Sequence, residues 1–243
     1  MEFSEKEELI SMSRDSDIDY LYQRVIQIIG SESNWPKWRE GWRDRADLAL
    51  LDAVYSTRQR YETTVLPRVK EWERRFPAAR YSGLEYLAEI DEYEIRKVFG
   101  GNVLPGVKIP GIRTGRRKSE GVKEIAQRLC SPEVGLKSAQ QIRDAVSKDG
   151  LNHVERLLQE TKGVGPATSR YFLMLIGVDG VKVDSLLGSW VRAQMGNSDL
   201  KNEEITELVS RVALEKFGRK ATDLDYAIWN YESNNRPRGN RMS

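Results

Sequence analysis

The chain has 243 residues, of which 39% are hydrophobic and 31% charged, a composition typical of a soluble globular protein. No apolar run approaches the roughly 18 residues that a membrane-spanning helix needs, and the first residues do not form a signal-peptide pattern. The single cysteine, Cys130, excludes an internal disulfide and a four-cysteine iron–sulfur cluster, and with only one histidine a zinc site is not expected. We therefore expect a protein of a reducing compartment: the cytoplasm or, in a eukaryote, the nucleus.

Charge is spread unevenly along the chain, although the net charge is only +2. The first twenty residues contain seven acidic side chains. By contrast, residues 106–119 contain five basic side chains, Arg116 and Arg117 among them, and no acidic one. Residues 234–243 add three unopposed arginines. Each basic segment has two interpretations: a surface for phosphate, or an ordinary solvated loop and tail.

Apolar residues recur with helical spacing almost throughout the chain. The repeats predict helices within residues 18–29, 48–55, 122–129 and 205–217. Capping boxes predict helix starts at Ser138 with Gln141, Asn152 with Glu155, and Thr222 with Asp225. Helix ends are expected at Gly100–Gly101, Gly150, Gly177 and Gly218, and Pro67 predicts a kink or break within residues 61–76. Only residues 180–183 suggest an extended segment, so we predict an all-α fold.

The most informative segment is Gly163-Val164-Gly165, which lies between two helical patterns and is followed by Pro166. The two glycines allow a tight turn and leave backbone N–H groups uncovered, so that a phosphate can approach closely. Proline suits the first turn of a helix, because no N–H partner is needed there. The pattern predicts a helix-hairpin-helix that binds a DNA backbone without reading its sequence.

Asp184 follows Gly165 by nineteen residues and precedes an apolar stretch that begins with Leu186-Leu187. In one interpretation this aspartate is an ordinary helix N-cap. In the other it adds chemistry to the DNA-binding hairpin. Both interpretations can hold together, because a capping position fixes the carboxylate in place.

Taken together, the hairpin and Asp184 resemble the helix-hairpin-helix DNA glycosylases, the superfamily that includes endonuclease III, adenine glycosylase, and the alkyladenine and 8-oxoguanine glycosylases. Residues 48–56 followed by Arg58-Gln59 look like the family's helix that ends in a Ser-x-Gln-type loop. Residues 77–99, 118–129 and 224–229 resemble further helices of that domain. The resemblance covers residues 18–233, between an acidic extension, 1–17, and a basic tail, 234–243.

The resemblance implies two helical subdomains that flank a DNA-binding cleft. The central subdomain is expected at residues 46–176, and the second is expected to combine 18–45 with 177–233. The implied partner is double-stranded DNA, and the implied state is a monomer.

The resemblance also implies that Asp184 is catalytic. A carboxylate beside C1′ stabilises the oxocarbenium-like transition state of N-glycosidic cleavage, and it orients or deprotonates the attacking water. Family members that also cut the strand have a lysine two residues after the hairpin, where this sequence has Ala167. The expected reaction is therefore water-mediated base removal that leaves an abasic site, with Lys162 as a phosphate contact or solvated side chain rather than a displaced nucleophile. Among the family's members, the alkylated-purine glycosylases have the closest chemical pattern.

Candidate DNA contacts lie in the hairpin, in the loop after residue 56 and in the basic loop: Lys162, Gly163, Val164, Gly165, Ala167, Thr168, Arg58, Gln59, Arg116 and Arg117. By position, Arg58 or Gln59 is the wedge that fills the gap left by a flipped nucleotide. The candidate base pocket is formed by Trp35, Trp38, Tyr171 and Trp190. The spacing of Trp35, Trp38 and Trp42 equally suits a stripe in a helical core.

No cofactor is required by this chemistry. By resemblance, the hairpin holds a structural monovalent cation, K⁺ or Na⁺, on the main-chain carbonyls of Gln159, Thr161 and Val164. The competing hypothesis is a non-catalytic DNA-binding or lesion-sensing protein with the same hairpin, and Asp184 favours the enzyme. A third, weaker hypothesis is a helical interaction protein in which Gly-Val-Gly is coincidental.

Overall fold

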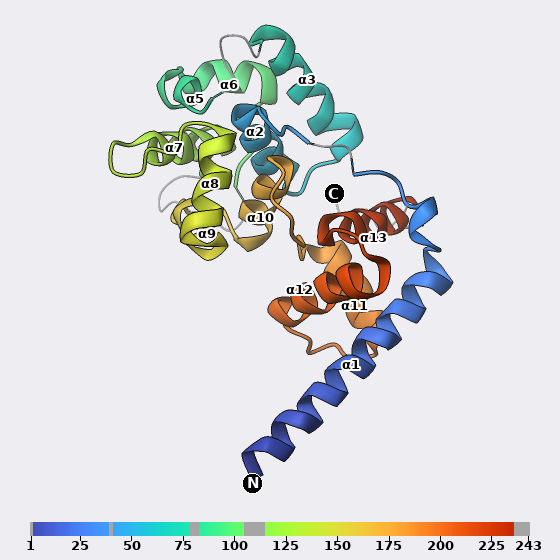
Figure 1. Ribbon diagram of the computed structural model, residues 1–243. Coiled ribbons are helices and arrows are strands. Elements are labelled where there is room, and N and C mark those ends of the chain that lie inside the picture. The colour runs from blue at the N-terminus through green and yellow to red at the C-terminus, as the bar shows by residue number, and fades with distance from the viewer. Residues whose placement is uncertain (1, 39–40, 78–82, 105–114, 236–243) are drawn as a thin grey trace. The chain divides into compact units, whose positions relative to one another are not determined.

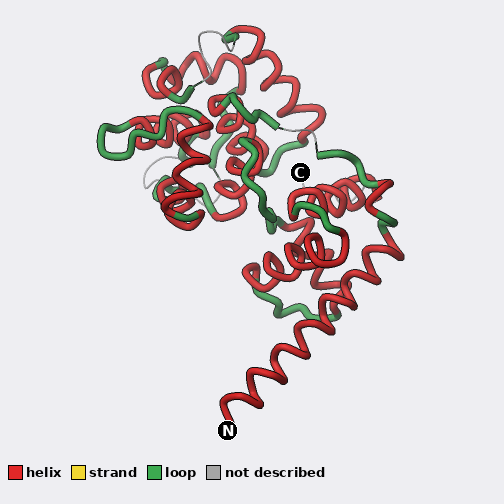
Figure 2. The backbone as a smooth tube through the Cα atoms, in the orientation of Figure 1, coloured by secondary structure: helices red, strands yellow, loops and turns green. Residues whose placement is uncertain are grey.

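The computed structural model describes residues 2–38, 41–77, 83–104 and 115–235, with side chains from residue 15 onward. Within those ranges the chain forms helices joined by loops, as Figures 1 and 2 show. The one β-type pairing there is an isolated bridge between Val103 and Arg117, and residues 180–183 are extended without forming a strand. The predicted all-α fold is confirmed. No helix of the described ranges is long and apolar enough to cross a membrane.

The chain divides into two compact units, each described here by itself. The first combines residues 1–39 with 179–243, and we call it the Asp184 unit. The second is continuous, residues 40–178, and we call it the hairpin unit. The Asp184 unit is thus assembled from two segments that lie far apart in the sequence.

The core of the Asp184 unit forms where the first helix packs against the last ones. Its elements are α1 (Glu2–Ile28), η1 (Glu32–Asn34), α11 (Ser185–Met195), α12 (Asn202–Arg211), the π-helical η3 (Val212–Lys216) and α13 (Ala221–Asn235). α1 packs against α11, α12 and η3, and α13 packs against the same three. The apolar stripe predicted near the chain start is confirmed, because Ile18, Leu21 and Val25 are buried in this core.

The hairpin unit is built around one buried helix. Its elements are α2 (Ala46–Ser56), the π-helical η2 (Tyr61–Val65), α3 (Leu66–Arg75), α5 (Glu85–Glu89), α6 (Glu92–Phe99), α7 (Lys118–Cys130), α8 (Ala139–Asp149), α9 (Leu151–Gln159) and α10 (Pro166–Leu175). α2 packs against η2, α3, α7 and α10, and every residue from Ala46 to Tyr55 is buried. A helix buried on all sides forces its polar members, Asp47 and Asp52, to find partners inside the protein.

Several helix boundaries follow from local signals. Ser138 caps α8 in a capping box with Gln141, as predicted. Gly100 and Gly150 follow directly after α6 and α8 at φ 77° and 85°, a region that favours glycine. Pro67 stands in the first turn of α3, and the chain before it is π-helical, so the predicted break is confirmed.

Two other predicted helix starts are wrong. α9 begins at Leu151 with Gly150 as its N-cap, so Asn152 lies inside the helix. α13 begins at Ala221, where Asp179 from another segment accepts hydrogen bonds from the N–H groups of Ala221 and Thr222. In α13 the Asp179 carboxylate satisfies the first turn in place of a local cap, whereas no side chain of the described residues caps α9.

Candidate functional site

The Gly163–Gly165 segment forms a tight turn between α9 and α10, as predicted. Gly163 has φ 95°, and the Val164 N–H donates to the Thr161 carbonyl at 3.0 Å. Val164 and Thr161 are buried, and they anchor the turn to the interior of the protein. Gly165 is the N-cap of α10 and Pro166 stands in its first turn, the place where a missing N–H carries no cost.

The N-terminus of α10 is open. A Cβ built on Gly165 would meet no atom within 4 Å, and no side chain caps the helix. In the described part of the chain, the N–H groups of Gly163, Gly165 and Ala167 have no hydrogen-bond partner. Free N–H groups at the positive end of a helix dipole form a binding site for an anion such as phosphate.

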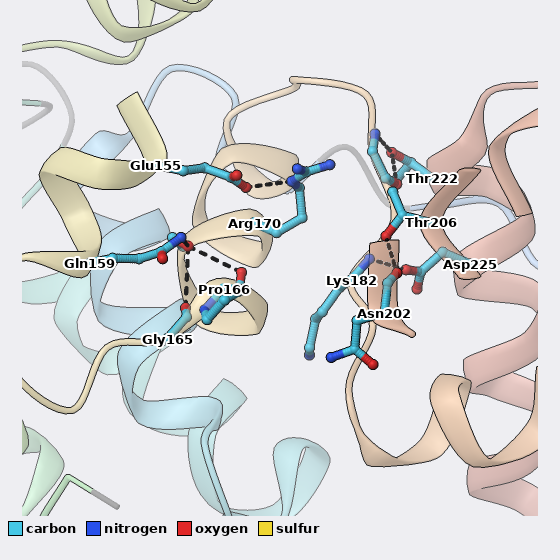
Figure 3. Close-up of polar contacts among 12 residues, drawn as sticks. Glu155, Gln159, Gly165, Pro166, Arg170, Lys182, Asn202, Thr206, Thr222 and Asp225 are labelled. Carbon is cyan, nitrogen blue, oxygen red and sulfur yellow. Dashed lines mark hydrogen bonds and ion pairs between the residues drawn. The ribbon is translucent and has the colours of Figure 1, made fainter. Parts of the chain in front are cut away.

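Two polar contacts fix α9 and α10 to each other (Figure 3). The buried Glu155 on α9 pairs with Arg170 on α10 at 2.6 Å. The Gln159 amide donates to the Ser169 hydroxyl at 3.0 Å, and that hydroxyl lies against the carbonyls of Gly165 and Pro166. The turn therefore has a fixed backbone, which a site made of N–H groups requires.

The start of the hairpin is also held from α7. The Thr161 hydroxyl donates to Glu124 at 3.0 Å and accepts from Arg128 at 2.6 Å. The neighbouring arginines Arg116 and Arg128 hold the pKa of Glu124 below its ordinary value, against the opposing effect of its burial. The hairpin turn is thus tied to a charged network as well as to the core.

Of the proposed carbonyl ligands of a monovalent cation, Thr161 already accepts the Val164 N–H. A carbonyl oxygen has two lone pairs, so this bond leaves one for an ion. The Thr161 carbonyl can thus still act as a ligand, and the assignment of a hard cation to the carbonyls of Gln159, Thr161 and Val164 remains a prediction.

The loop after α2 lies beside the hairpin. The hydroxyls of Thr57 and Thr168 are 3.4 Å apart, which brings residues 111 positions apart in sequence together. Arg58 is exposed and has φ 55°, and Gln59 is half-buried. The structure therefore brings two groups of predicted DNA-binding residues together within one unit.

The remaining basic residues predicted to contact DNA differ in their exposure and in their partners. Lys162 is exposed next to the turn. Arg116 pairs with Glu124, and Arg117 lies 4.0 Å from Glu92, so both face a carboxylate. Residues 106–114 of the basic loop and 236–243 of the tail lie outside the described residues.

Asp184 is the N-cap of α11. Its Oδ1 accepts hydrogen bonds from the N–H groups of Leu186 at 2.8 Å and Leu187 at 3.1 Å. Its Oδ2 lies 3.6 Å from the Lys182 ammonium, and the side chain is 23% exposed. The capping interpretation is confirmed, and the capping bonds use only one of the two carboxylate oxygens.

The segment before Asp184 is held by the first turns of α13 (Figure 3). The Thr222 hydroxyl bonds to the backbone of Gly180, and Asp225 accepts the Lys182 N–H at 2.5 Å. Asp225 is buried, which raises its pKa to about 7, while Lys182 opposes the rise and Asp184 adds to it. Sequence reasoning took Asp225 for a capping residue; its contact is 43 positions away, and no local signal identifies it.

The candidate pocket aromatics have different surroundings. Trp35 and Trp190 are 9% and 4% exposed and belong to the core of the Asp184 unit, where Trp35 contacts Phe217. Trp38 is half-buried against Tyr226, and Tyr171 is half-buried on α10. Trp38 and Tyr171 are therefore each partly buried, whereas Trp35 and Trp190 belong to the core.

Comparison with known proteins identifies a solved structure of similar fold and a family to which the chain belongs. No curated protein matches the sequence. A solved structure described as "Structure of MBOgg1 in complex with low affinity DNA ligand" matches with a TM-score of 0.51 and 14% identity. The match covers 79% of this chain and 61% of that one, and at this identity it shows likeness of fold alone. A family model matches residues 19–233, and the chain therefore belongs to the family described as a domain of unknown function, DUF8548.

Proposed function

We propose that this protein is a monofunctional DNA glycosylase. The observation that carries the proposal is the open N-terminus of α10 at a rigid Gly-Val-Gly turn, in a fold like that of a protein solved with a DNA ligand. Uncovered N–H groups contact phosphate and carry no sequence information, which suits an enzyme that searches duplex DNA for rare damaged bases.

Asp184 supplies the chemistry in this proposal. The bond between C1′ and the base nitrogen breaks, the base leaves with the bonding electrons, and the sugar develops positive charge at C1′. The Asp184 carboxylate stabilises that charge, and a water molecule then adds to C1′ and transfers its proton to the same carboxylate. Because Oδ1 is fixed by two N–H groups, the charge is held in place before the reaction begins.

The product in this proposal is an abasic site with an intact strand. Ala167 has no amine to attack C1′. Lys182, the lysine nearest Asp184 within its own unit, is paired with that carboxylate, and an ion-paired ammonium is a poor nucleophile. We propose an alkylated purine as the substrate, double-stranded DNA as the partner and a monomer as the active form.

The test is a screen of the purified protein against duplexes that each contain one damaged base, followed by alkali to cleave abasic sites. The proposal expects alkali-dependent cleavage on at least one alkylated-purine duplex, and its loss in Asp184→Asn. Cleavage without alkali would contradict the monofunctional assignment. Tight duplex binding with no base release from any lesion would overturn the glycosylase.

A second candidate function is a non-catalytic protein that senses lesions by binding. It is favoured by the capping bonds of Asp184, which alone account for an aspartate at that position. The same screen separates the two functions: a sensor binds lesion duplexes more tightly than intact ones, and Asp184→Asn leaves that preference unchanged.

A further inference from the structure

Arg58 has an unusual backbone. In the described part of the chain it is the one residue other than glycine with a positive φ, 55°. For a side chain with a Cβ this left-handed conformation is unfavourable, and it persists only where the surroundings impose it. A π-helical segment, η2, begins at Tyr61, directly after the loop of residues 57–60, which we call the Arg58 loop. Such π-helical segments are rare and are frequent at functional sites.

A single buried carboxylate holds both ends of the Arg58 loop. Asp52 on α2 is fully buried, and it accepts hydrogen bonds from Ser56, Tyr61 and Trp42, each at 2.9 Å. Ser56 is the residue before the loop, and Tyr61 is the residue after it. Asp52 thus hydrogen-bonds to a residue at each end of the loop, and it fixes the two ends relative to each other.

A buried cation holds the start of the same loop. Lys118, the first residue of α7, is 1% exposed, and its ammonium donates to the carbonyls of Thr57 at 2.6 Å and Tyr55 at 3.1 Å. Among the described residues no carboxylate lies within ion-pair distance of it. Burial lowers the pKa of Lys118 to about 8. An ammonium without a carboxylate partner is costly to bury, so packing alone does not account for this lysine.

The loop held in this way lies next to the hairpin. The Thr57 hydroxyl lies 3.4 Å from that of Thr168, in the first turn of α10. That helix begins with the uncovered N–H groups to which we assign phosphate. The exposed Arg58 side chain makes no hydrogen bond or ion pair with the described residues, and it is therefore presented at a fixed place relative to a bound backbone.

We propose that Asp52 and Lys118 are positioning residues that hold the Arg58 loop in its left-handed conformation, so that the Arg58 side chain enters a DNA duplex beside the phosphates bound by the hairpin. Neither residue touches DNA. The inference rests on the DNA binding of the proposed function, and it does not require base excision.

The first experiment measures the loop without DNA. Trypsin cleaves after arginine, so cleavage after Arg58 and Arg60 reports how often the loop opens, and mass spectrometry identifies the cut. We expect Tyr61→Phe and Lys118→Met to speed these two cuts about tenfold while other sites keep their rates. The exposed Tyr93→Phe and Lys148→Met serve as matched controls, and they should leave the rates unchanged.

The second experiment measures the loop's effect on DNA. A duplex with 2-aminopurine next to an abasic-site analogue fluoresces more when the base stack is opened. The wild-type protein should raise the fluorescence, and Arg58→Ala, Tyr61→Phe and Lys118→Met should each lose most of that rise. Affinity should stay within about threefold, because the phosphate contacts of the hairpin remain.

Variants of Asp52 separate positioning from simple loss of folding. In Asp52→Asn, the amide oxygen can accept from Trp42 and Tyr61 while the amide N–H₂ donates to the Ser56 hydroxyl, so each of these three hydrogen bonds has a substitute. Wild-type behaviour is expected in both experiments. Asp52→Ala removes the hydrogen bonds from Ser56, Tyr61 and Trp42, and it should match Tyr61→Phe or exceed it. If Lys118→Met does not fold, Tyr61→Phe and Asp52→Asn carry the test.

Two outcomes would overturn the inference. Unchanged cleavage after Arg58 and Arg60 in Tyr61→Phe and Lys118→Met would show that the loop does not depend on these residues. Faster cleavage with unchanged fluorescence would show that the loop is not the part that enters DNA. If the wild-type protein opens the stack but releases no base from any lesion, base excision fails while this inference stands.

Discussion

The N-termini of α10 and α11 illustrate two opposite uses of the same structural feature. The N-cap of α10 is Gly165, and no side chain in the described part of the chain covers the first N–H groups of that helix. The N-cap of α11 is Asp184, whose carboxylate accepts two of the first N–H groups of its own helix. Both helix ends carry the positive end of a dipole. The first end is left uncovered, and the second is satisfied by the protein's own anion.

The difference lies in what each end makes available. An open helix end offers N–H groups, which can bind a phosphate group whatever the sequence of the nucleic acid that carries it. A capped end fixes a carboxylate and therefore supplies a negative charge at a defined place. In the proposed glycosylase the open end of α10 binds the backbone and the capped end of α11 provides the catalytic group.

The largest expected effect comes from Asp184→Asn. Asparagine caps a helix about as well as aspartate, so α11 should still form, but the negative charge is lost. Single-turnover base release should fall by about 10²–10³, the range found when one electrostatic group is removed from an active site. DNA affinity should hold or rise. Asp199→Asn, an exposed aspartate before α12, is the control, and equal rates for both variants would remove Asp184 from the mechanism.

The next largest effect concerns Asp225 and pH. Its pKa is about 7 in the folded protein against an ordinary value of 3.8, chiefly because it is buried. Between those values the folded protein binds the extra proton, so the stability from this group is full below pH 3.8 and is lost as pH rises through about 7.

The free energy of unfolding should therefore fall by roughly 3 kcal/mol from pH 5 to pH 8 through this group, because about two pH units separate pH 5 from its pKa at about 1.4 kcal/mol per unit. Urea unfolding at both pH values measures it. In Asp225→Asn, which imitates the protonated carboxyl, the difference should shrink by that amount. An undiminished difference in Asp225→Asn would show that other groups set the pH dependence.

A smaller effect should separate the two hairpin glycines. Gly163 has φ 95°, so Gly163→Ala should cost about 1 kcal/mol of stability through backbone strain. Gly165 has φ −107° and open space at its Cβ, so Gly165→Val should fold well. It should nevertheless weaken binding to damaged and intact duplexes alike, by about tenfold, because a side chain would stand where phosphate approaches. A loss confined to one lesion would place Gly165 in the base pocket instead.

The smallest expected signal is a trapped covalent adduct. Wild-type protein incubated with a substrate duplex and borohydride should give none, because position 167 is alanine. Ala167→Lys should give a detectable fraction, since it introduces an amine able to form a Schiff base. Lys162→Ala is the companion control. An adduct formed by the wild-type protein and lost in Lys162→Ala would contradict the monofunctional assignment.

What could be predicted from sequence was what local chemistry decides. Glycine and proline around position 164 specified the turn, and apolar spacing specified α1 and α2, because these signals act within a few residues. The helical spacing of Trp35 and Trp38 was misleading, because no helix forms there. Pro36 keeps the backbone of the preceding residue, Trp35, extended at φ −66° and ψ 141°. The contacts of Asp52, Lys118 and Asp225 depend on tertiary packing. Asp225 contacts Lys182, 43 positions away in the sequence, and Lys118 contacts Tyr55, 63 positions away.

The division of the chain has a consequence for its synthesis. All residues of the hairpin unit, 40–178, leave the ribosome before the second segment of the Asp184 unit, which starts at 179. At about 5–20 residues per second, α1 waits on the order of ten seconds before α11 exists to cover Leu21 and Val25. During that interval the hairpin unit can fold alone, while the apolar stripe of α1 stays open to chaperones or to a second nascent chain.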